Sequence, residues 1–205
     1  MTIKAVLTGD LIHSRSVGDT QAYLAALKQV LADLQHIYGF TADIYRGDGF
    51  QVVLDEATHA LKCALAIRAG LISASPDKER WDARVAVGIG SAESDFTYGE
   101  AFILSGQGLD SMKKATLAVF SNDERFNERT ELTTDFVAAI VEKWTVVEAR
   151  TYCMHLVDDD SQETIAQVLG KSRITVNKTL RRAQARLLDR YLQRVGQWIK
   201  ELADA

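Results

Sequence analysis

Ile44-Tyr45-Arg46-Gly47-Asp48-Gly49-Phe50 predicts a tight β-hairpin in the N-terminal half of the chain. An Asp-Gly pair between strand-like segments is a strong hairpin signal, because two-residue turns need residues that accept positive φ. We expect the hairpin to span Ala42 to Leu54, with Arg46 to Gly49 at its tip.

Strands and helices alternate on both sides of this hairpin. Upstream, the apolar run Ile3 to Leu7 predicts a buried strand that ends at Thr8-Gly9-Asp10. Asp19-Thr20 then caps a helix that Gly39 stops. Downstream we expect an amphipathic helix, a buried strand, a helix and a short strand, at Thr58 to Ile72, Ala83 to Ile89, Tyr98 to Lys114 and Thr116 to Phe120. This order predicts an α+β fold with a mixed sheet.

A polar, charged stretch, Ser121 to Thr130, follows the last strand, and from Leu132 onward every pattern is helical. We therefore predict an α+β domain at residues 1–121 and an all-α domain at residues 131–205.

The composition is that of an ordinary soluble globular protein, with 47% hydrophobic and 25% charged residues. No apolar run approaches the roughly 18 residues of a membrane span. Cys63 and Cys153 have neither metal nor disulfide spacing, which suits a reducing compartment. We expect a cytoplasmic protein without a membrane partner.

Basic residues gather in one segment. The formal net charge of the chain is −4, which argues against nucleic-acid binding by the molecule as a whole. Between Lys171 and Arg194, however, eight Lys or Arg residues stand against the single acidic residue Asp189. Such an asymmetry indicates a nucleic-acid partner for that segment alone.

The same segment has the pattern of a helix-turn-helix, from Ser161 to Arg186. Asp160 or Ser161 is expected to cap a first helix that ends at Gly170, and Ser172 to cap a second. The apolar core of the pair is expected to consist of Ile165, Val168, Leu169, Ile174, Val176 and Leu180.

This pattern, from Ile165-Ala166 through Leu169-Gly170 to Thr175-Val176, resembles the helix-turn-helix of sigma-factor region four and of LuxR-type regulators. The resemblance implies double-stranded DNA as the partner, with the second helix in the major groove. It implies that base edges or phosphates are contacted by Ser172, Arg173, Thr175, Asn177 and Lys178. It also implies that the DNA backbone is contacted by Arg181, Arg182 and Arg186. A plain helical hairpin with a solvated basic face, or a pair of helices that binds a protein, fits the same residues.

The second helix is expected to run on into a C-terminal helix with an apolar stripe from Leu187 to Ile199. This stripe packs either on the body or on a second subunit. Since helix-turn-helix proteins commonly read paired half-sites, we expect a homodimer.

Two aspartates in the body suggest a second site. Asp10 closes the first strand, and Asp48 lies at the hairpin tip between Gly47 and Gly49. If both strands lie in the middle of one sheet, the two carboxylates meet at one end. Paired carboxylates suit Mg²⁺ or Mn²⁺ with a triphosphate, and the glycines permit close approach of phosphate. A cap or turn for Asp10, and the turn itself for Asp48, are the structural alternatives.

Four successive motifs carry a family resemblance: Val6 to Ile12, Gly47 to Phe50, Val85 to Gly90 and Asp95 to Phe102. They resemble those of class III nucleotide cyclases, and the hairpin is also similar to that of diguanylate cyclases. Both families share a ferredoxin-like palm fold, which implies a βαββαβ body. The whole arrangement, with its C-terminal helix-turn-helix, looks most like the SatD-like bacterial family.

The cyclase resemblance implies that Asp10 and Asp48 bind metal and that Gly47, Gly49 and Asp95 contact a nucleotide. The chain departs from the cyclase pattern on the helix that carries the transition-state Asn and Arg, where it has Ile103 and Gln107. The base-selecting Lys is replaced by Ile44, and the second acidic residue of the diguanylate cyclase hairpin by Gly49.

The sequence therefore predicts a DNA-binding transcription regulator. Its cyclase-like body, without the transition-state residues, senses a nucleotide or forms the dimer. An active Mg²⁺-dependent nucleotidyl cyclase or transferase with an appended helix-turn-helix is the alternative. A structural interaction protein with neither activity is a third.

Overall fold

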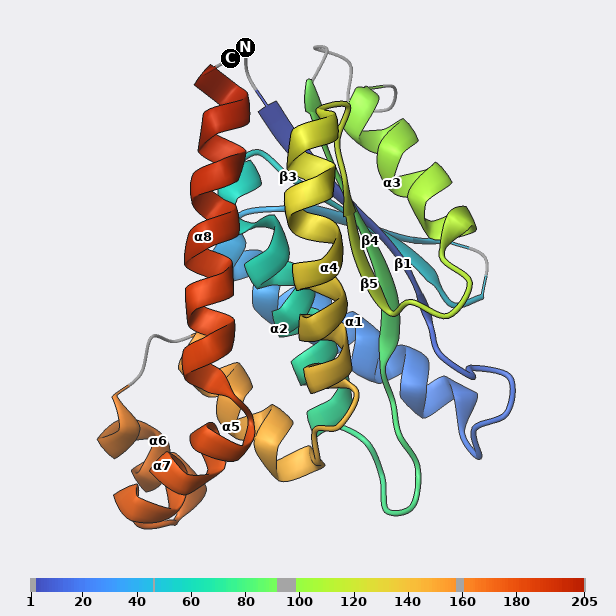
Figure 1. The fold of residues 1–205 in the computed structure, drawn as a ribbon. Coiled ribbons are helices and arrows are strands. Elements are labelled where there is room, and N and C mark those ends of the chain that lie inside the picture. Colours follow the sequence, from blue (N-terminus) through green and yellow to red (C-terminus); the bar gives the residue numbers. More distant parts are fainter. Residues whose placement is uncertain (1–2, 46, 92–98, 158–160, 205) are drawn as a thin grey trace.

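The computed structural model describes residues 3–45, 47–91, 99–157 and 161–204. Five strands form one sheet in the order β2-β3-β1-β4-β5 (Figure 1). They are β1 Ile3–Leu11, β2 Thr41–Tyr45, β3 Gly49–Leu54, β4 Ala83–Ser91 and β5 Leu117–Phe120. Only the β4–β5 pairing is parallel. The mixed sheet and the α+β class are as predicted, and the first four strands have the ferredoxin-like connection order.

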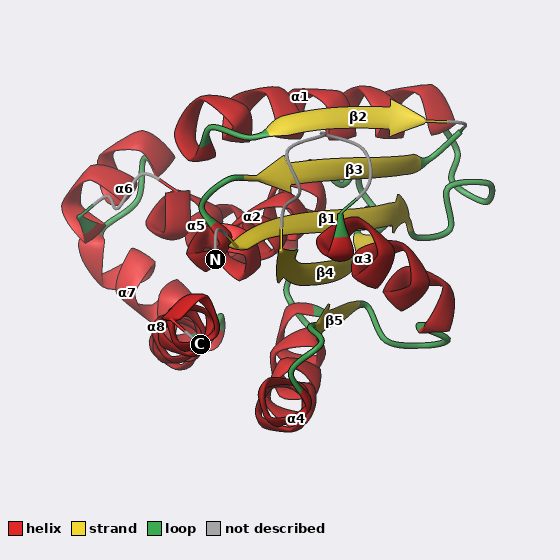
Figure 2. Cartoon of the chain, turned by 90° about the horizontal axis from the view of Figure 1, so that it is seen from above, coloured by secondary structure: helices red, strands yellow, loops and turns green. Residues whose placement is uncertain are grey.

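Helices cover both faces of the sheet (Figure 2). Helices α1 (Thr20–Tyr38) and α2 (Ala60–Ser73) lie on one face, and α3 (Glu100–Ser111) lies on the other. Side chains alternate along β1, so Leu7 enters the core beneath α1 and α2 while Thr8 meets α3. There the Thr8 and Ser105 hydroxyls lie 2.8 Å apart. Gly88 lets α3 approach closely, because a Cβ there would stand 2.2 Å from the Ala101 carbonyl oxygen.

Two predictions for the body need correction. β1 continues to Leu11, so Asp10 lies within a paired strand rather than in a turn after it, because β4 and β3 both extend alongside it. Helix α2 is not amphipathic: nearly all its residues are buried, because the sheet, α1 and a later helix enclose it. A short 3₁₀ turn, Ala57–His59, precedes it.

In the described part of the chain, five helices follow the sheet: α4 (Glu124–Val141), α5 (Val146–Val157), α6 (Gln162–Leu169), α7 (Arg173–Arg182) and α8 (Ala185–Asp204). α4 packs along β5, and α8 lies beside it with its C-terminal end near the start of β1 (Figure 1). α5 packs on α2, and α6 and α7 lie at the far end of α8. One apolar core runs through the sheet and these helices.

Within the polar stretch Ser121–Thr130, α4 already begins at Glu124, capped by Asp123. Its first turns are polar on the outside only, while Phe126 and Thr130 face the core. The expected run-on of the second helix into the C-terminal helix is wrong. Gln184 has a φ of 61°, which is outside the range of a right-handed helix, so the helix is interrupted between α7 and α8.

A buried polar cluster ties the helices to the body. The Arg68 guanidinium donates to both carboxylate oxygens of Asp82, at 2.9 and 2.8 Å, and both side chains are almost fully buried. Arg80 also reaches Asp82 at 3.2 Å and donates to the carbonyls of Val141 and Trp144, where α4 ends. Nothing in the sequence patterns pointed to this cluster. Among the described helices, none is both long and apolar enough to span a membrane.

Candidate functional site

Asp10 is held by an arginine that faces it across the sheet. Arg84 is its partner in the antiparallel β1–β4 register. The guanidinium donates from Nε to Oδ1 at 2.9 Å and from Nη2 to Oδ2 at 2.5 Å. Its Nη1 donates to the Met112 carbonyl at the end of α3, at 2.9 Å. The hydrogen bonds to Asp10 raise the pKa of Arg84 above its ordinary value.

Asp48 lies at the same end of the sheet, as the sequence predicted. Its neighbour Gly49 pairs with Asp10 in the β1–β3 register, and the Asp48 charge adds to the raised pKa of Arg84. The Asp48 carboxylate accepts a hydrogen bond from the Ser14 hydroxyl, and its backbone carbonyl accepts one from the Leu11 amide at 3.2 Å. Gly47 has a φ of 87°, which the tight hairpin tip requires. Asp95, the third nucleotide candidate, lies outside the described residues.

These residues do not fit a divalent ion held jointly by Asp10 and Asp48. The Arg84 guanidinium engages one lone pair on each oxygen of Asp10, so a metal ion would have to share this carboxylate with a cation. A guanidinium also adds a positive charge where a cation is expected to sit. Within the described ranges, no cluster of three or more His, Cys, Asp or Glu side chains is arranged to hold a metal. We therefore derive no chemistry through Mg²⁺ or Mn²⁺ here.

The positions of the missing transition-state residues lie elsewhere. Ile103 and Gln107 are exposed on the outer side of α3 and line a hollow of about 390 Å³ with Glu100. This hollow begins at Ser91, which pairs with Ile3 at the opposite end of β1 from Asp10. Among the described residues that line it there is neither Lys nor Arg, so these residues offer no cation to a phosphate.

The second candidate site is the α6–α7 pair. Ser161 caps α6, accepting from the Thr164 amide at 3.2 Å, and Ser172 caps α7, accepting from the Thr175 amide at 3.1 Å. Between them Gly170 has a φ of 61°, and Lys171 donates to the Ala166 carbonyl at 2.9 Å, which closes the turn. Ser161, rather than Asp160, is therefore the cap that the structure describes. Both helices and the turn are as predicted.

The core of the pair is smaller than predicted. Ile165, Val176 and Leu180 are buried as expected, Leu169 is partly buried against the core, and Ala166 is buried as well. Val168 and Ile174 are 62% and 69% exposed, so their assignment to the core is wrong. α6 and α7 have only eight and ten residues, and each packs against its neighbours through one side. Apolar residues on the other sides of these helices therefore face solvent.

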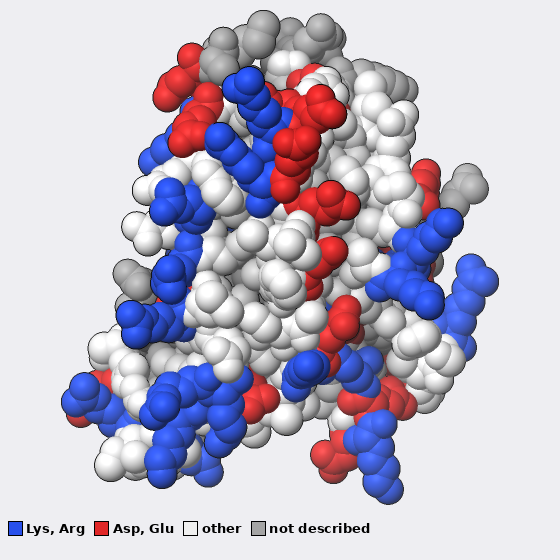
Figure 3. Space-filling view, viewed as in Figure 1, with Lys and Arg blue, Asp and Glu red and all other residues white. Residues whose placement is uncertain are grey.

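The exposed side of α7 carries Ile174, Asn177, Lys178 and Arg181, at the spacing of one helix face. Asn177 contacts Gln162 of α6 at 3.3 Å, and Arg181 and Arg186 line a polar hollow of about 620 Å³ beside it. Figure 3 shows Lys and Arg gathered over this end of the molecule. The side chains of Ser172 and Thr175 take part in the cap, and Arg173 lies 3.9 Å from Glu163.

Arg182 differs from Arg181 in having an acidic partner. Its Nε donates to Glu148 of α5 at 3.0 Å. Burial raises the pKa of Glu148, but hydrogen bonds from the Thr145 amide and from Arg182 outweigh it, so the pKa lies below its usual value. The Trp144 indole N–H donates a second hydrogen bond, to the Ala183 carbonyl at the end of α7, at 3.1 Å. α7 is thus fixed to α5 on one side and open to solvent on the other.

Comparison with known proteins yields structural similarities alone. No protein-family model matches the chain, and no curated protein matches its sequence. Membership of the SatD-like family therefore stays a prediction. The guanylyl cyclase Cya2 is 14% identical, with a TM-score of 0.40, over 57% of this chain and 74% of its own. The dimeric guanylyl cyclase domain of the RhoGC fusion protein from the aquatic fungus Blastocladiella emersonii is 13% identical, with a TM-score of 0.41, over 58% and 79%.

Proposed function

We propose that the protein is a DNA-binding transcription regulator in which α7 enters the major groove of double-stranded DNA. The observation that carries the proposal is the exposed face of α7, where Asn177, Lys178 and Arg181 stand beside an uncovered Ile174. Both helices are capped and joined by a glycine turn, and α5 fixes the opposite side of α7. These are the requirements of a recognition helix that must hold its side chains in register with base pairs.

The four residue types suit groove readout. An Asn amide can bond N6 and N7 of adenine together, and Arg can bond O6 and N7 of guanine or a phosphate. An exposed Ile is costly in water but favourable against the methyl group of thymine. Lys178, Arg181 and Arg186 supply charge for the DNA backbone, where release of counterions drives binding.

The body has a non-catalytic role in this proposal. The Arg84 fork on Asp10 and the cation-free hollow at Ile103 and Gln107 support that role, since phosphoryl transfer depends on positive charge around the phosphates. The body then acts as a sensor or as the platform for assembly. A nucleotide ligand for it stays a prediction.

Selection of bound duplexes from a random pool, followed by fluorescence anisotropy on the enriched sequence, tests the proposal. We expect an enriched motif, tighter binding to it than to a scrambled duplex, and affinity that falls steeply with salt. The matched variant is Asn177→Ala with Lys178→Ala. It removes two exposed side chains from the face assigned to DNA and leaves the buried face of α7 intact. Failure to bind any duplex at low salt, where counterion release favours binding most, would overturn the proposal.

A further inference from the structure

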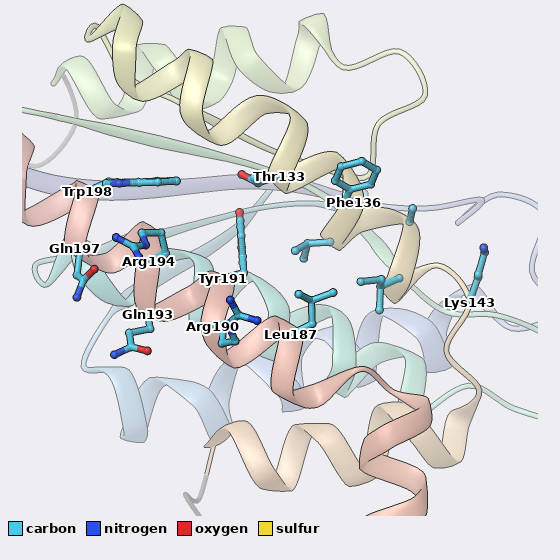
Figure 4. A pocket seen from close by; sticks show the side chains of 13 residues that line it. Thr133, Phe136, Lys143, Leu187, Arg190, Tyr191, Gln193, Arg194, Gln197 and Trp198 are labelled. Atoms are coloured by element: carbon cyan, nitrogen blue, oxygen red, sulfur yellow. The ribbon is translucent and has the colours of Figure 1, made fainter.

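A long groove runs between α4 and α8. Its volume is about 630 Å³, and Figure 4 shows its lining side chains reaching in from both helices. Val137, Ile140 and Tyr191 form part of its lining, and the Tyr191 hydroxyl is within 2.7 Å of the Thr134 hydroxyl. The floor of the groove is therefore a direct contact between α4 and α8.

Apolar side chains remain uncovered along this face. Leu132 and Phe136, one turn apart on α4, are each 61% exposed, and Leu187 on α8 is 48% exposed. Leu132 and Phe136 form a ridge along α4, and Phe136 and Leu187 also line the groove from its two sides. A ridge of this kind next to an apolar groove is typical of a surface that another protein chain covers.

The two sides of the face carry opposite charges. Glu128, Glu131 and Asp135 are exposed at successive turns of α4, and Arg190 and Arg194 are exposed one turn apart on α8, where they line the groove. Figure 3 shows acidic side chains over α4 and basic side chains along the N-terminal half of α8, with uncharged surface between them there, whereas both signs lie together toward the C-terminal end of α8, where Arg129 pairs with Glu201. In the part of the chain that the structure describes, Arg190 and Arg194 form no ion pair.

We propose that this face binds the same face of a second copy of the chain, about a two-fold axis parallel to α4 and α8. That rotation exchanges the two sides of the face, so the acidic row of each copy lies opposite the basic row of the other. It also lays the Leu132–Phe136 ridge of each copy along the other's groove, which gives four helices packed as a bundle. A two-fold axis across the helices would set acid against acid, which excludes that arrangement.

This axis has a consequence for DNA binding, and that consequence alone rests on the proposed function. Rotation about an axis parallel to α8 keeps both α6–α7 pairs at the same end of the dimer. Two α7 helices at one end are what a dimer needs to contact two half-sites on one side of a duplex. The same helices that form the interface therefore place the two DNA-binding ends.

A charge swap tests the interface without DNA. In the acid-row variant Glu131→Lys is combined with Asp135→Lys, and in the basic-row variant Arg190→Glu is combined with Arg194→Glu. Each row then meets its own sign in a homodimer, so the dissociation constant of each variant alone should rise about tenfold or more. In an equimolar mixture of the two variants, each row of one variant faces a row of opposite charge on the other. A heterodimer should therefore form with close to wild-type affinity. Sedimentation equilibrium measures all three samples.

Two further variants complete the design. Lys113→Glu with Lys114→Glu reverses two exposed charges outside the face and should leave the dimer intact. Leu132→Gln with Phe136→Gln removes the ridge without changing charge and should give a monomer with the wild-type circular dichroism spectrum. A wild-type protein that is monomeric at micromolar concentration overturns the proposal. So does a dimer that survives both row reversals, since it then forms through another surface.

Discussion

Arg84 donates two hydrogen bonds to the carboxylate of Asp10 from the position directly opposite it in the β1–β4 register. The pair forms whenever the two strands align, because the register alone brings the side chains together. It places a guanidinium on the carboxylate that the cyclase resemblance assigns to a metal ion. The body thus has the two aspartates that the resemblance assigns to a metal ion, and a guanidinium is bound to one of them.

Replacing Arg84 with Gln should free Asp10 and make the sheet end more receptive to a metal ion. We expect the free energy of unfolding to fall by about 1–2 kcal/mol, because a partly buried carboxylate loses a charged partner. Mn²⁺ should then bind the variant more tightly than the wild type, which calorimetry and the quenching of the free Mn²⁺ electron-spin signal both measure. Arg84→Gln combined with Asp10→Asn is the control, and it should lose the gained affinity. Equal Mn²⁺ affinity in the wild type and Arg84→Gln would contradict the prediction.

Features set by local chemistry could be predicted from the sequence. The hairpin at Asp48, the Asp19 cap with its Gly39 stop, and the Ser161, Gly170 and Ser172 signals each depend on a few adjacent residues. Such caps and turns satisfy backbone groups within one turn of the chain, so their residue types are informative without the tertiary fold.

Features set by the tertiary fold could not be predicted from the sequence. Arg84 lies 74 residues from Asp10, and only the strand register makes them partners. Ile174 has the residue type of a core position, yet the side of α7 that faces α6 and α5 is chosen by packing. The start of α4 was missed because most of its first turns face solvent, so polar residues there indicate an exposed helix as readily as a loop.

Gly170→Ala should destabilise the protein by about 1 kcal/mol, because a Cβ is strained at a φ of 61° even though open space surrounds it. The matched control is Gly106→Ala in α3, where a Cβ also meets open space but the backbone is helical. That change should stabilise by about 0.5–1 kcal/mol. Urea unfolding of both variants measures the difference. Equal effects of the two substitutions would show that the turn conformation at Gly170 is not strained for Ala.

The Glu148–Arg182 ion pair should make the attachment of α7 dependent on pH. The folded pKa of Glu148 lies below its ordinary value, so its contribution is complete above that value and is lost as the pH falls through the folded pKa. Glu148→Gln should cost about 1 kcal/mol at neutral pH, since it removes an ion pair and one partner of the hydrogen bonds with Thr145. Unfolding by urea across the acidic range should show the wild type and variant converging. A constant difference at all pH values would rule out the ionised carboxylate as its source.

Arg181 and Arg182 are adjacent on α7 but should contribute differently to DNA binding. Arg181 is exposed beside the recognition face, whereas Arg182 donates to Glu148 on the opposite side. Arg181→Ala should therefore weaken binding to all duplexes alike and reduce the slope of log affinity against log salt by about one unit, because one phosphate contact is lost. Arg182→Ala should change that slope by much less. Asn177→Ala should instead relax the preference for one base pair at little cost in slope. Fluorescence anisotropy on matched and scrambled duplexes over a salt series separates the three, and identical slopes for the two arginine variants would show that the face assigned to DNA is wrong.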